Sequence, residues 1–157
     1  MPAVEGKKAP SFTLMGDDNN KHKLANLKGK RVVLYFYPRD NTPGCTTEAC
    51  NFRDNMERIT QTGAVVYGVS KDNLVSHERF SDKNSLNFVL LTDPDLAVHK
   101  RYEAYGEKML YGKPRVGVIR STFIIDEEGI LSKAFRNIRV KGHVDKVIEA
   151  LEAMPAM

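Results

Sequence analysis

The chain has 157 residues and a net charge of +4 at pH 7, and 41% of its residues are hydrophobic while 28% are charged. This length and composition are typical of one globular domain, so we expect a single domain over residues 1–157. The basic residues are scattered and no aromatic residues alternate with them, which argues against nucleic-acid binding. No apolar segment is long enough for a signal peptide or a membrane span, so we expect a cytoplasmic protein without membrane contact.

The pattern of apolar and turn residues predicts an N-terminal hairpin first, with strands at 9–14 and 21–24 and one helical turn at 24–27. An almost wholly apolar segment at 32–37 then predicts a central strand covered on both faces, and a helix follows from about 43 to 61. Later strands are predicted at 64–69, 88–91, 118–126 and 130–135, and later helices at about 74–84, 93–105 and 141–154. The segment 106–117 is predicted as a loop whose residues Met109, Leu110 and Tyr111 fold back onto the domain.

The order of these elements implies an α/β fold with a mixed central sheet and helices on both faces. We expect His22 on the exposed hairpin and His77 and His99 on the surfaces of their helices. Arg39 and Asp40 are predicted to face solvent. The two cysteines and four histidines show no spacing that is typical of a metal site, so we expect no bound metal.

The most informative segment is the loop that joins the strand at 32–37 to the following helix. It ends in Cys45, which the pattern places in the first turn of the helix. Free backbone N–H groups and the helix dipole at that end favour a thiolate, which is the nucleophilic form of cysteine. Pro43 suits the first helical position and makes Thr42 the candidate N-cap. Gly44 leaves the backbone beside the sulfur open to a small ligand.

The second cysteine of the chain, Cys50, lies in the same predicted helix. Five residues of regular helix separate two Cα atoms by roughly 8.7 Å, against about 7 Å for a disulfide. A bond between Cys45 and Cys50 therefore requires the first turns of the helix to unwind. Thr46, Thr47 and Asn51 are weak helix formers, which makes that unwinding easier.

The spacing Pro38-x-x-x-Thr42-x-x-Cys45 resembles the active-site pattern of peroxiredoxins. The longer string Tyr-Phe-Tyr-Pro-Arg-Asp-Asn-Thr-Pro-Gly-Cys-Thr-Thr-Glu-Ala-Cys resembles the bacterioferritin comigratory protein branch, also called peroxiredoxin Q. The resemblance extends from Ala9 to about Leu151. It implies a thioredoxin-like fold with an N-terminal β-hairpin addition.

The resemblance also implies a chemistry for these residues. Cys45 is expected to attack hydrogen peroxide or an organic hydroperoxide and become a sulfenic acid, and Cys50 to resolve it as an intramolecular disulfide. Thioredoxin or a similar dithiol donor is the implied reductant, with no cofactor and a monomeric protein. Arg120 and the hydroxyl of Thr42 are expected to donate to the sulfur or the peroxide. The supporting residues implied by the motif are Pro38, Gly44 and Glu48. Pro38 is expected to shield the sulfur and shape the loop, and Glu48 to orient Arg120 or the helix terminus.

Two other functions are compatible with the residues themselves. A disulfide reductase on the same fold would react slowly with peroxide. A redox sensor or holdase would bind a partner only when oxidised and would not turn over peroxide. Two of the candidate residues also have a purely structural alternative. Cys50 can be an inert buried thiol, and Thr42 can act as a helix cap alone.

Overall fold

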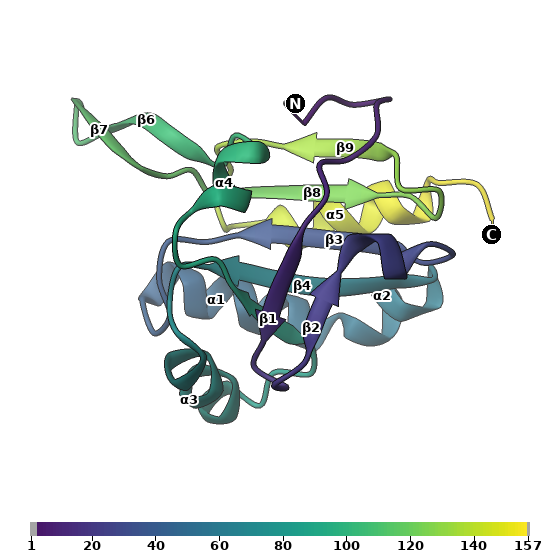
Figure 1. The fold of residues 1–157 in the computed structure, drawn as a ribbon, viewed down its shortest axis with the longest axis horizontal. Helices are drawn as coiled ribbons and strands as arrows, with labels where there is room; N and C mark the ends of the chain where they lie inside the picture. The colour runs from purple at the N-terminus through teal and green to yellow at the C-terminus, as the bar shows by residue number, and fades with distance from the viewer. Residues whose placement is uncertain (1–2, 157) are drawn as a thin grey trace.

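The computed structural model describes residues 3–156, with the side chain of Leu110 excepted. Its centre is a seven-stranded sheet in the order β2-β1-β5-β4-β3-β8-β9 (Figure 1). The strands are β1 Thr13–Gly16, β2 Lys21–Lys23, β3 Arg31–Phe36, β4 Ala64–Ser70, β5 Val89–Thr92, β8 Ser121–Ile125 and β9 Leu131–Phe135. Strands β3, β4 and β5 are parallel, while β1, β2, β8 and β9 join in antiparallel pairs. The predicted mixed sheet with an N-terminal hairpin is confirmed.

Strand β3 is apolar from Val32 to Phe36, which fits a strand covered on both faces. Its alternate residues Val32, Leu34 and Phe36 belong to one core cluster, which also contains the aromatic ring of Tyr102. The opposite face of the strand, with Val33 and Tyr35, packs in a second cluster. Every residue of β3 is buried, so the strand fixes the point at which the following segment begins.

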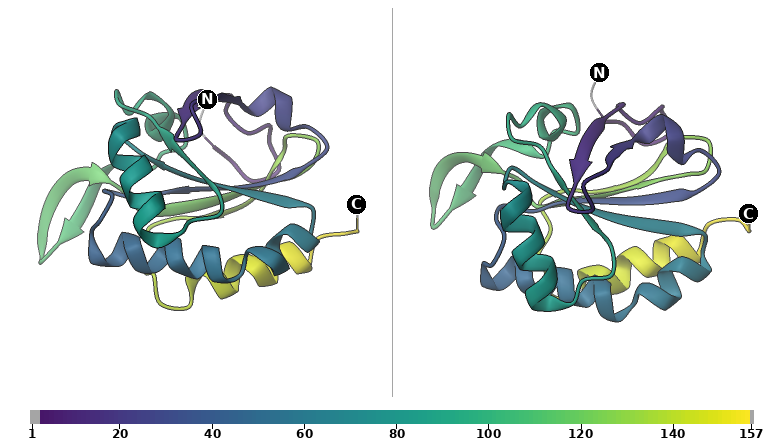
Figure 2. Two further views of the ribbon diagram at one scale, coloured as in Figure 1. Left: turned by 90° about the horizontal axis from the view of Figure 1, so that it is seen from below. Right: turned by 60° about the horizontal axis from the view of Figure 1, so that its bottom comes forward.

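Helices lie on both sides of the sheet (Figure 2). On one side are α1 Pro43–Asp54, α2 Met56–Gln61 and α5 His143–Glu152, and the core on this side also includes Phe80 from α3 Leu74–Asn84. The other side holds the 3-10 turn η1 Leu24–Leu27 and α4 Ala97–Arg101, and the edge strands β1 and β2 of the sheet curl over this side. The predicted helix at 74–84 has the observed bounds of α3.

Two predicted helices differ from the structure in their extent. The segment 43–61 forms two helices because Asn55 leaves helical geometry and its side chain donates to the carbonyl of Asn51. Helix α4 begins only at Ala97, because the side chain of Asp93 accepts hydrogen bonds from the N–H groups of Val98 and His99. It ends soon afterwards, since Glu103 has a φ of 58°.

The predicted loop at 106–117 is instead a β-hairpin that projects from the body of the protein (Figure 1). Its strands are β6 Tyr105–Leu110 and β7 Lys113–Val118. Tyr111 and Gly112 both have positive φ, which is the geometry of a type I′ hairpin turn. Met109 and Tyr111 are 68% and 96% exposed, so the prediction that they fold back was wrong. The side chain of Leu110, included in that prediction, lies outside the described part of the chain.

The surface placement predicted for two histidines and one aspartate was also wrong. His77 and His99 are fully buried, and Asp40 is 5% exposed. Each histidine pairs with a buried carboxylate, His77 with Asp40 at 2.8 Å and His99 with Asp93 at 2.6 Å. A polar group can be buried when it is hydrogen-bonded in this way.

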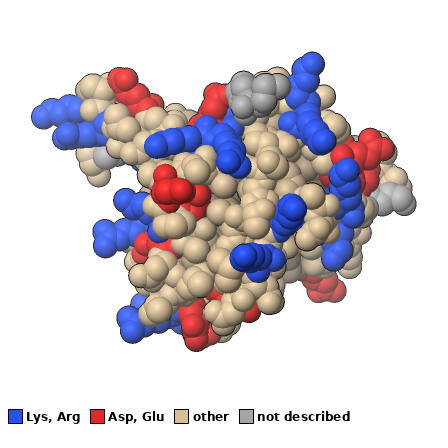
Figure 3. Space-filling model, in the orientation of Figure 1, with Lys and Arg blue, Asp and Glu red and all other residues tan. Residues whose placement is uncertain are grey.

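On the face shown in Figure 3, Lys and Arg side chains lie in separate groups rather than in one continuous basic surface. Within residues 3–156, no helix is both long and apolar enough to cross a membrane. The absence of nucleic-acid and membrane partners and the single domain stay predictions.

Candidate active site

The site is built where β3 ends and α1 begins. Pro43 occupies the first turn of α1, and Thr42 has the extended backbone of an N-cap residue, with φ −86° and ψ 151°. Cys45 lies in this first turn and is 1% exposed. The predicted strand, loop and helix start are therefore confirmed, and the sulfur is close to the free N–H groups of a helix N-terminus.

The side chain of Thr42 does not cap the helix. Its hydroxyl donates to the carbonyl of Arg39 at 2.8 Å, and it accepts no hydrogen bond from the helix N–H groups. The predicted N-cap position of Thr42 is therefore confirmed, although its side chain makes no capping hydrogen bond. Pro38 is partly buried at the start of the same loop. The substrate role of Thr42 and the shielding role of Pro38 stay predictions.

Arg120 contacts the sulfur of Cys45, although it is 75 residues away in the sequence. It lies between β7 and β8, and its Nη2 donates to Cys45 Sγ at 3.3 Å. Its Nη1 donates to Glu48 Oε1 at 2.7 Å. The backbone of Arg120 is also fixed, because its carbonyl accepts a hydrogen bond from the N–H of Ile138 at 3.0 Å. One guanidinium thus bridges the thiol and a carboxyl group.

Glu48 lies one helical turn after Cys45 and is fully buried. Burial raises the pKa of this carboxyl to about 7, although the charge and hydrogen bond of Arg120 act to lower it. Burial alone would lower the pKa of Arg120, but Glu48 and Cys45 outweigh burial and hold that pKa above its usual value. The second carboxyl oxygen of Glu48 has no hydrogen-bond partner within residues 3–156.

Gly44 sits directly against the guanidinium. A Cβ atom at this position would lie 3.3 Å from Arg120 Nη2 and 4.0 Å from Val140 Cγ2. The lack of a side chain therefore allows Arg120 to lie close to the first turn of α1. The structure thus brings together four of the predicted site residues, Gly44, Cys45, Glu48 and Arg120.

Comparison with known proteins gives one consistent answer. A family model described as the AhpC/TSA family matches residues 5–134. A putative peroxiredoxin bcp of Helicobacter pylori is 51% identical over 146 residues, which are 93% of this chain and 96% of that protein. Peroxiredoxin Bcp of Bacillus subtilis is 45% identical and 95% of each chain is covered.

The chain belongs to the AhpC/TSA family.

Solved structures place it in the Bcp/peroxiredoxin Q branch of these peroxiredoxins. The bacterioferritin comigratory protein of Xanthomonas campestris superimposes with a TM-score of 0.85 at 38% identity, over 90% of both chains. A peroxiredoxin Q variant from Xylella fastidiosa gives 0.89 at 33% identity, over 96% of both. The thioredoxin-like fold is thereby confirmed. Because peroxiredoxins are peroxidases, the predicted enzyme class of this chain is also confirmed.

The second cysteine of this peroxiredoxin lies beside the end of α3. Cys50 is partly buried in α1, and its thiol lies 3.8 Å from Asn84 Oδ1 at the end of α3. Both cysteines are free thiols and both lie in one helix. The structure therefore has the fully folded helix from which a disulfide would have to form by unwinding.

Sequence reasoning missed the residues that hold the loop before Cys45. Asp40 was predicted to face solvent, yet its carboxylate is buried and contacts Tyr37, Ser76 and His77. The two partners on α3 are more than thirty residues away in the sequence, so no local pattern joins them to Asp40. The only signal available was an aspartate four residues after the end of a buried strand.

Proposed function

We propose that this peroxiredoxin reduces hydrogen peroxide and organic hydroperoxides through the thiol of Cys45. The observation that carries the proposal is the 3.3 Å contact from Arg120 Nη2 to Cys45 Sγ at a helix N-terminus. A fixed positive charge beside the sulfur stabilises the thiolate. The alkyl peroxide reduction activity named for the Xanthomonas campestris protein supports the inclusion of organic substrates.

In the first step the sulfur forms a bond to one peroxide oxygen and the O–O bond breaks. The departing oxygen takes the electron pair and a proton and leaves as water or an alcohol, while Cys45 becomes a sulfenic acid. Negative charge develops on the departing oxygen, so donors held in place beforehand lower the barrier. Arg120 supplies such donors, and the Thr42 hydroxyl can supply another once it turns from the Arg39 carbonyl.

In the second step Cys50 attacks the sulfenic sulfur, and the hydroxyl group leaves as water. The two thiols cannot bond within a regular helix, where their Cα atoms are roughly 8.7 Å apart against about 7 Å for a disulfide. Unwinding is helped because Thr46 and Thr47 bond back to the carbonyls of Thr42 and Pro43, a pattern that slightly destabilises helices.

The cycle closes when an external dithiol reduces the disulfide by thiol–disulfide exchange. Thioredoxin or a similar protein is the proposed donor. Both sulfurs belong to one chain, so the cycle runs in a monomer without a cofactor. Glu48 holds Arg120 in place, Gly44 keeps its approach open and Pro38 shields the sulfur. A cytoplasmic location stays a prediction.

The test is a peptide map by mass spectrometry after reduced protein receives one equivalent of hydrogen peroxide. We expect rapid loss of both thiols and one peptide pair joined through Cys45 and Cys50. Cys50→Ser is the matched variant, because it keeps the first thiol and should still consume one equivalent before stopping. Slow loss of both thiols in the wild type would instead favour a disulfide reductase.

A further inference from the structure

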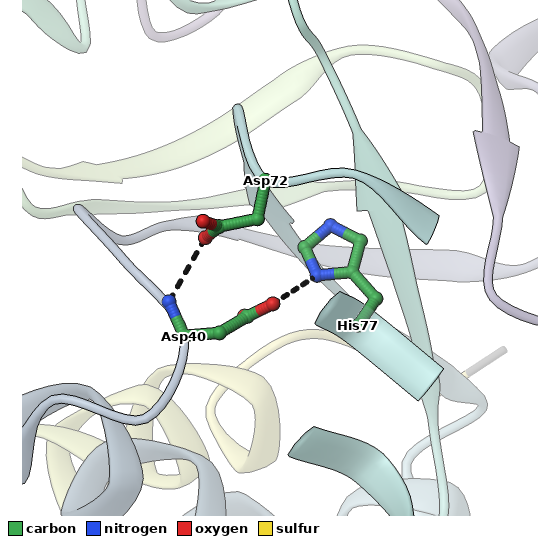
Figure 4. A group of neighbouring side chains, drawn as sticks. All are labelled: Asp40, Asp72 and His77. Carbon is green, nitrogen blue, oxygen red and sulfur yellow. Dashed lines mark hydrogen bonds and ion pairs between the residues drawn. The ribbon is translucent and has the colours of Figure 1, made fainter. Parts of the chain in front are cut away.

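A buried polar network fixes the loop that precedes Cys45. The side chain of Asp40 lies at its centre (Figure 4). Its Oδ1 accepts from the hydroxyl of Tyr37 at 2.6 Å, and its Oδ2 accepts from the hydroxyl of Ser76 at 2.8 Å. His77 Nδ1 lies 2.8 Å from the same Oδ2. The backbone N–H of Asp40 donates to Asp72 Oδ2 at 2.9 Å.

The imidazole of His77 has an acceptor on each side. Its Nε2 lies 3.0 Å from the carbonyl oxygen of Leu91, which can only accept. Its Nδ1 faces the Asp40 carboxylate, which already accepts from two hydroxyl groups. Both ring nitrogens of His77 therefore lie within hydrogen-bond distance of an oxygen atom, one on the Asp40 carboxyl group and one on the backbone of β5.

The network ties the loop to helix α3, which also contacts the other cysteine. Ser76 and His77 lie in the first turn of α3, and Asn84 at its last position lies 3.8 Å from the Cys50 sulfur. The carbonyl of Asn84 also accepts from Arg53 Nη1 at 2.7 Å. One helix therefore holds the chain just before Cys45 at one end and just after Cys50 at the other.

The loop after Asp40 contains a residue with a left-handed backbone. Asn41 has a φ of 63°, a conformation that is uncommon for residues other than glycine and that asparagine adopts more readily than most. Asp40 is the adjacent residue, and the contacts of its backbone and side chain fix where this turn lies. Without the network, the loop is free to relax and to move Thr42 and the first turn of α1 away from Arg120.

We propose that Asp40 and His77 are positioning residues for the peroxide reaction, because their buried contact at 2.8 Å holds the start of α1 at the correct place beside Arg120. The same pair provides the fixed upstream end when the turns between the cysteines unwind. The inference rests on the proposed function of Cys45. Asp40, Asp72 and His77 also bring ligand-type atoms within 4.8 Å of one another, but hydrogen bonds already occupy these atoms and we assign no metal.

The experiment compares Asp40→Asn with Asp93→Asn in single-turnover oxidation by hydrogen peroxide. Asp93 is the matched control, since it forms a similar buried pair with His99 at 2.6 Å and its side chain forms its hydrogen bonds with Val98 and His99 rather than with residues 38–42. We expect Asp40→Asn to slow oxidation of Cys45 by roughly 10- to 100-fold, the effect of misplacing reacting groups by about 1 Å. Asp93→Asn should stay within about twofold of the wild type, because only folding stability is affected.

Two further measurements separate positioning from general destabilisation. Nitrogen NMR of the His77 ring should show a changed signal in Asp40→Asn and an unchanged one in Asp93→Asn, because only the first substitution alters a direct contact of the ring. Ser76→Ala keeps the contact between Asp40 and His77 and removes one hydrogen bond, so its oxidation rate should fall between those of the wild type and Asp40→Asn.

The proposal is overturned if folded Asp40→Asn reacts at the wild-type rate, or if the NMR signal of the His77 ring is the same in Asp40→Asn and the wild type. Equal slowing by Asp93→Asn would also overturn it, since stability alone would then explain the effect. A wild-type protein that does not react with peroxide would instead refute the proposed function of Cys45, so the two failures are distinguishable.

Discussion

Glu48→Gln tests the electrostatics of the site through the pH dependence of stability. The carboxyl group is fully buried, and Arg120 Nη1 donates to one of its oxygens at 2.7 Å. Burial raises its pKa from 4.5 to about 7 against the opposing effect of Arg120. Glutamine has the same shape and still accepts from Arg120, so the substitution removes the titration and keeps the hydrogen bond.

The raised pKa of Glu48 determines whether stability rises or falls with pH. An acid with a higher pKa in the folded state stabilises the fold fully below its unfolded pKa, and this stabilisation is lost as the pH rises through the folded value. With a pKa of 4.5 in the unfolded chain and about 7 in the folded chain, the loss totals about 3 kcal/mol. Roughly 2–3 kcal/mol of it falls between about pH 5 and pH 8.

The assay is denaturant unfolding of reduced wild type and Glu48→Gln across this pH range. Other titrating groups are common to both proteins, so the difference between the two free energies isolates Glu48. We expect the wild type to lose roughly 2–3 kcal/mol relative to Glu48→Gln as the pH rises, with an unchanged denaturant slope. Glu78→Gln, at an exposed position of α3, should follow the wild type. If the free energy of unfolding changed with pH in the same way in wild type and Glu48→Gln, the reasoning would be refuted.

Local patterns were sufficient for the part of the site that is contiguous in sequence. The apolar run of β3, the proline at the first helical position and the following helix placed Cys45 correctly. The arginine could not be chosen by spacing, because Arg120 is 75 residues from Cys45. It was chosen by resemblance, and the structure places its guanidinium at the sulfur. Its role in catalysis stays a prediction.

The errors share a physical cause. A histidine on an amphipathic helix is predicted to lie on the surface unless a hydrogen-bond partner is known. The partner of His77 is Asp40, which is 37 residues away in the sequence. The hairpin at 105–118 was missed because Tyr111 adopts a positive φ that is uncommon for an aromatic residue. In both cases tertiary contacts or an unusual backbone angle override the local preference, and neither is visible in residue type alone.

Three further predictions concern buried groups around the site. Tyr35 has a buried hydroxyl with no partner within residues 3–156, so Tyr35→Phe should raise the free energy of unfolding by about 1 kcal/mol. Burial, assisted by nearby cations, lowers the pKa of His143 to about 4. The wild type should therefore lose stability relative to His143→Gln as the pH falls from about 6.5 towards 4, which the same unfolding assay measures. Gly44→Ala should change stability and activity in opposite directions. Alanine favours the helix by about 0.5 kcal/mol, whereas its Cβ would lie 3.3 Å from Arg120 Nη2 and press on the guanidinium. We expect a higher melting temperature together with oxidation of Cys45 that is roughly tenfold slower. An unchanged oxidation rate would mean that the arginine can move aside without losing its function, and its close contact with the first turn would then not matter for the reaction.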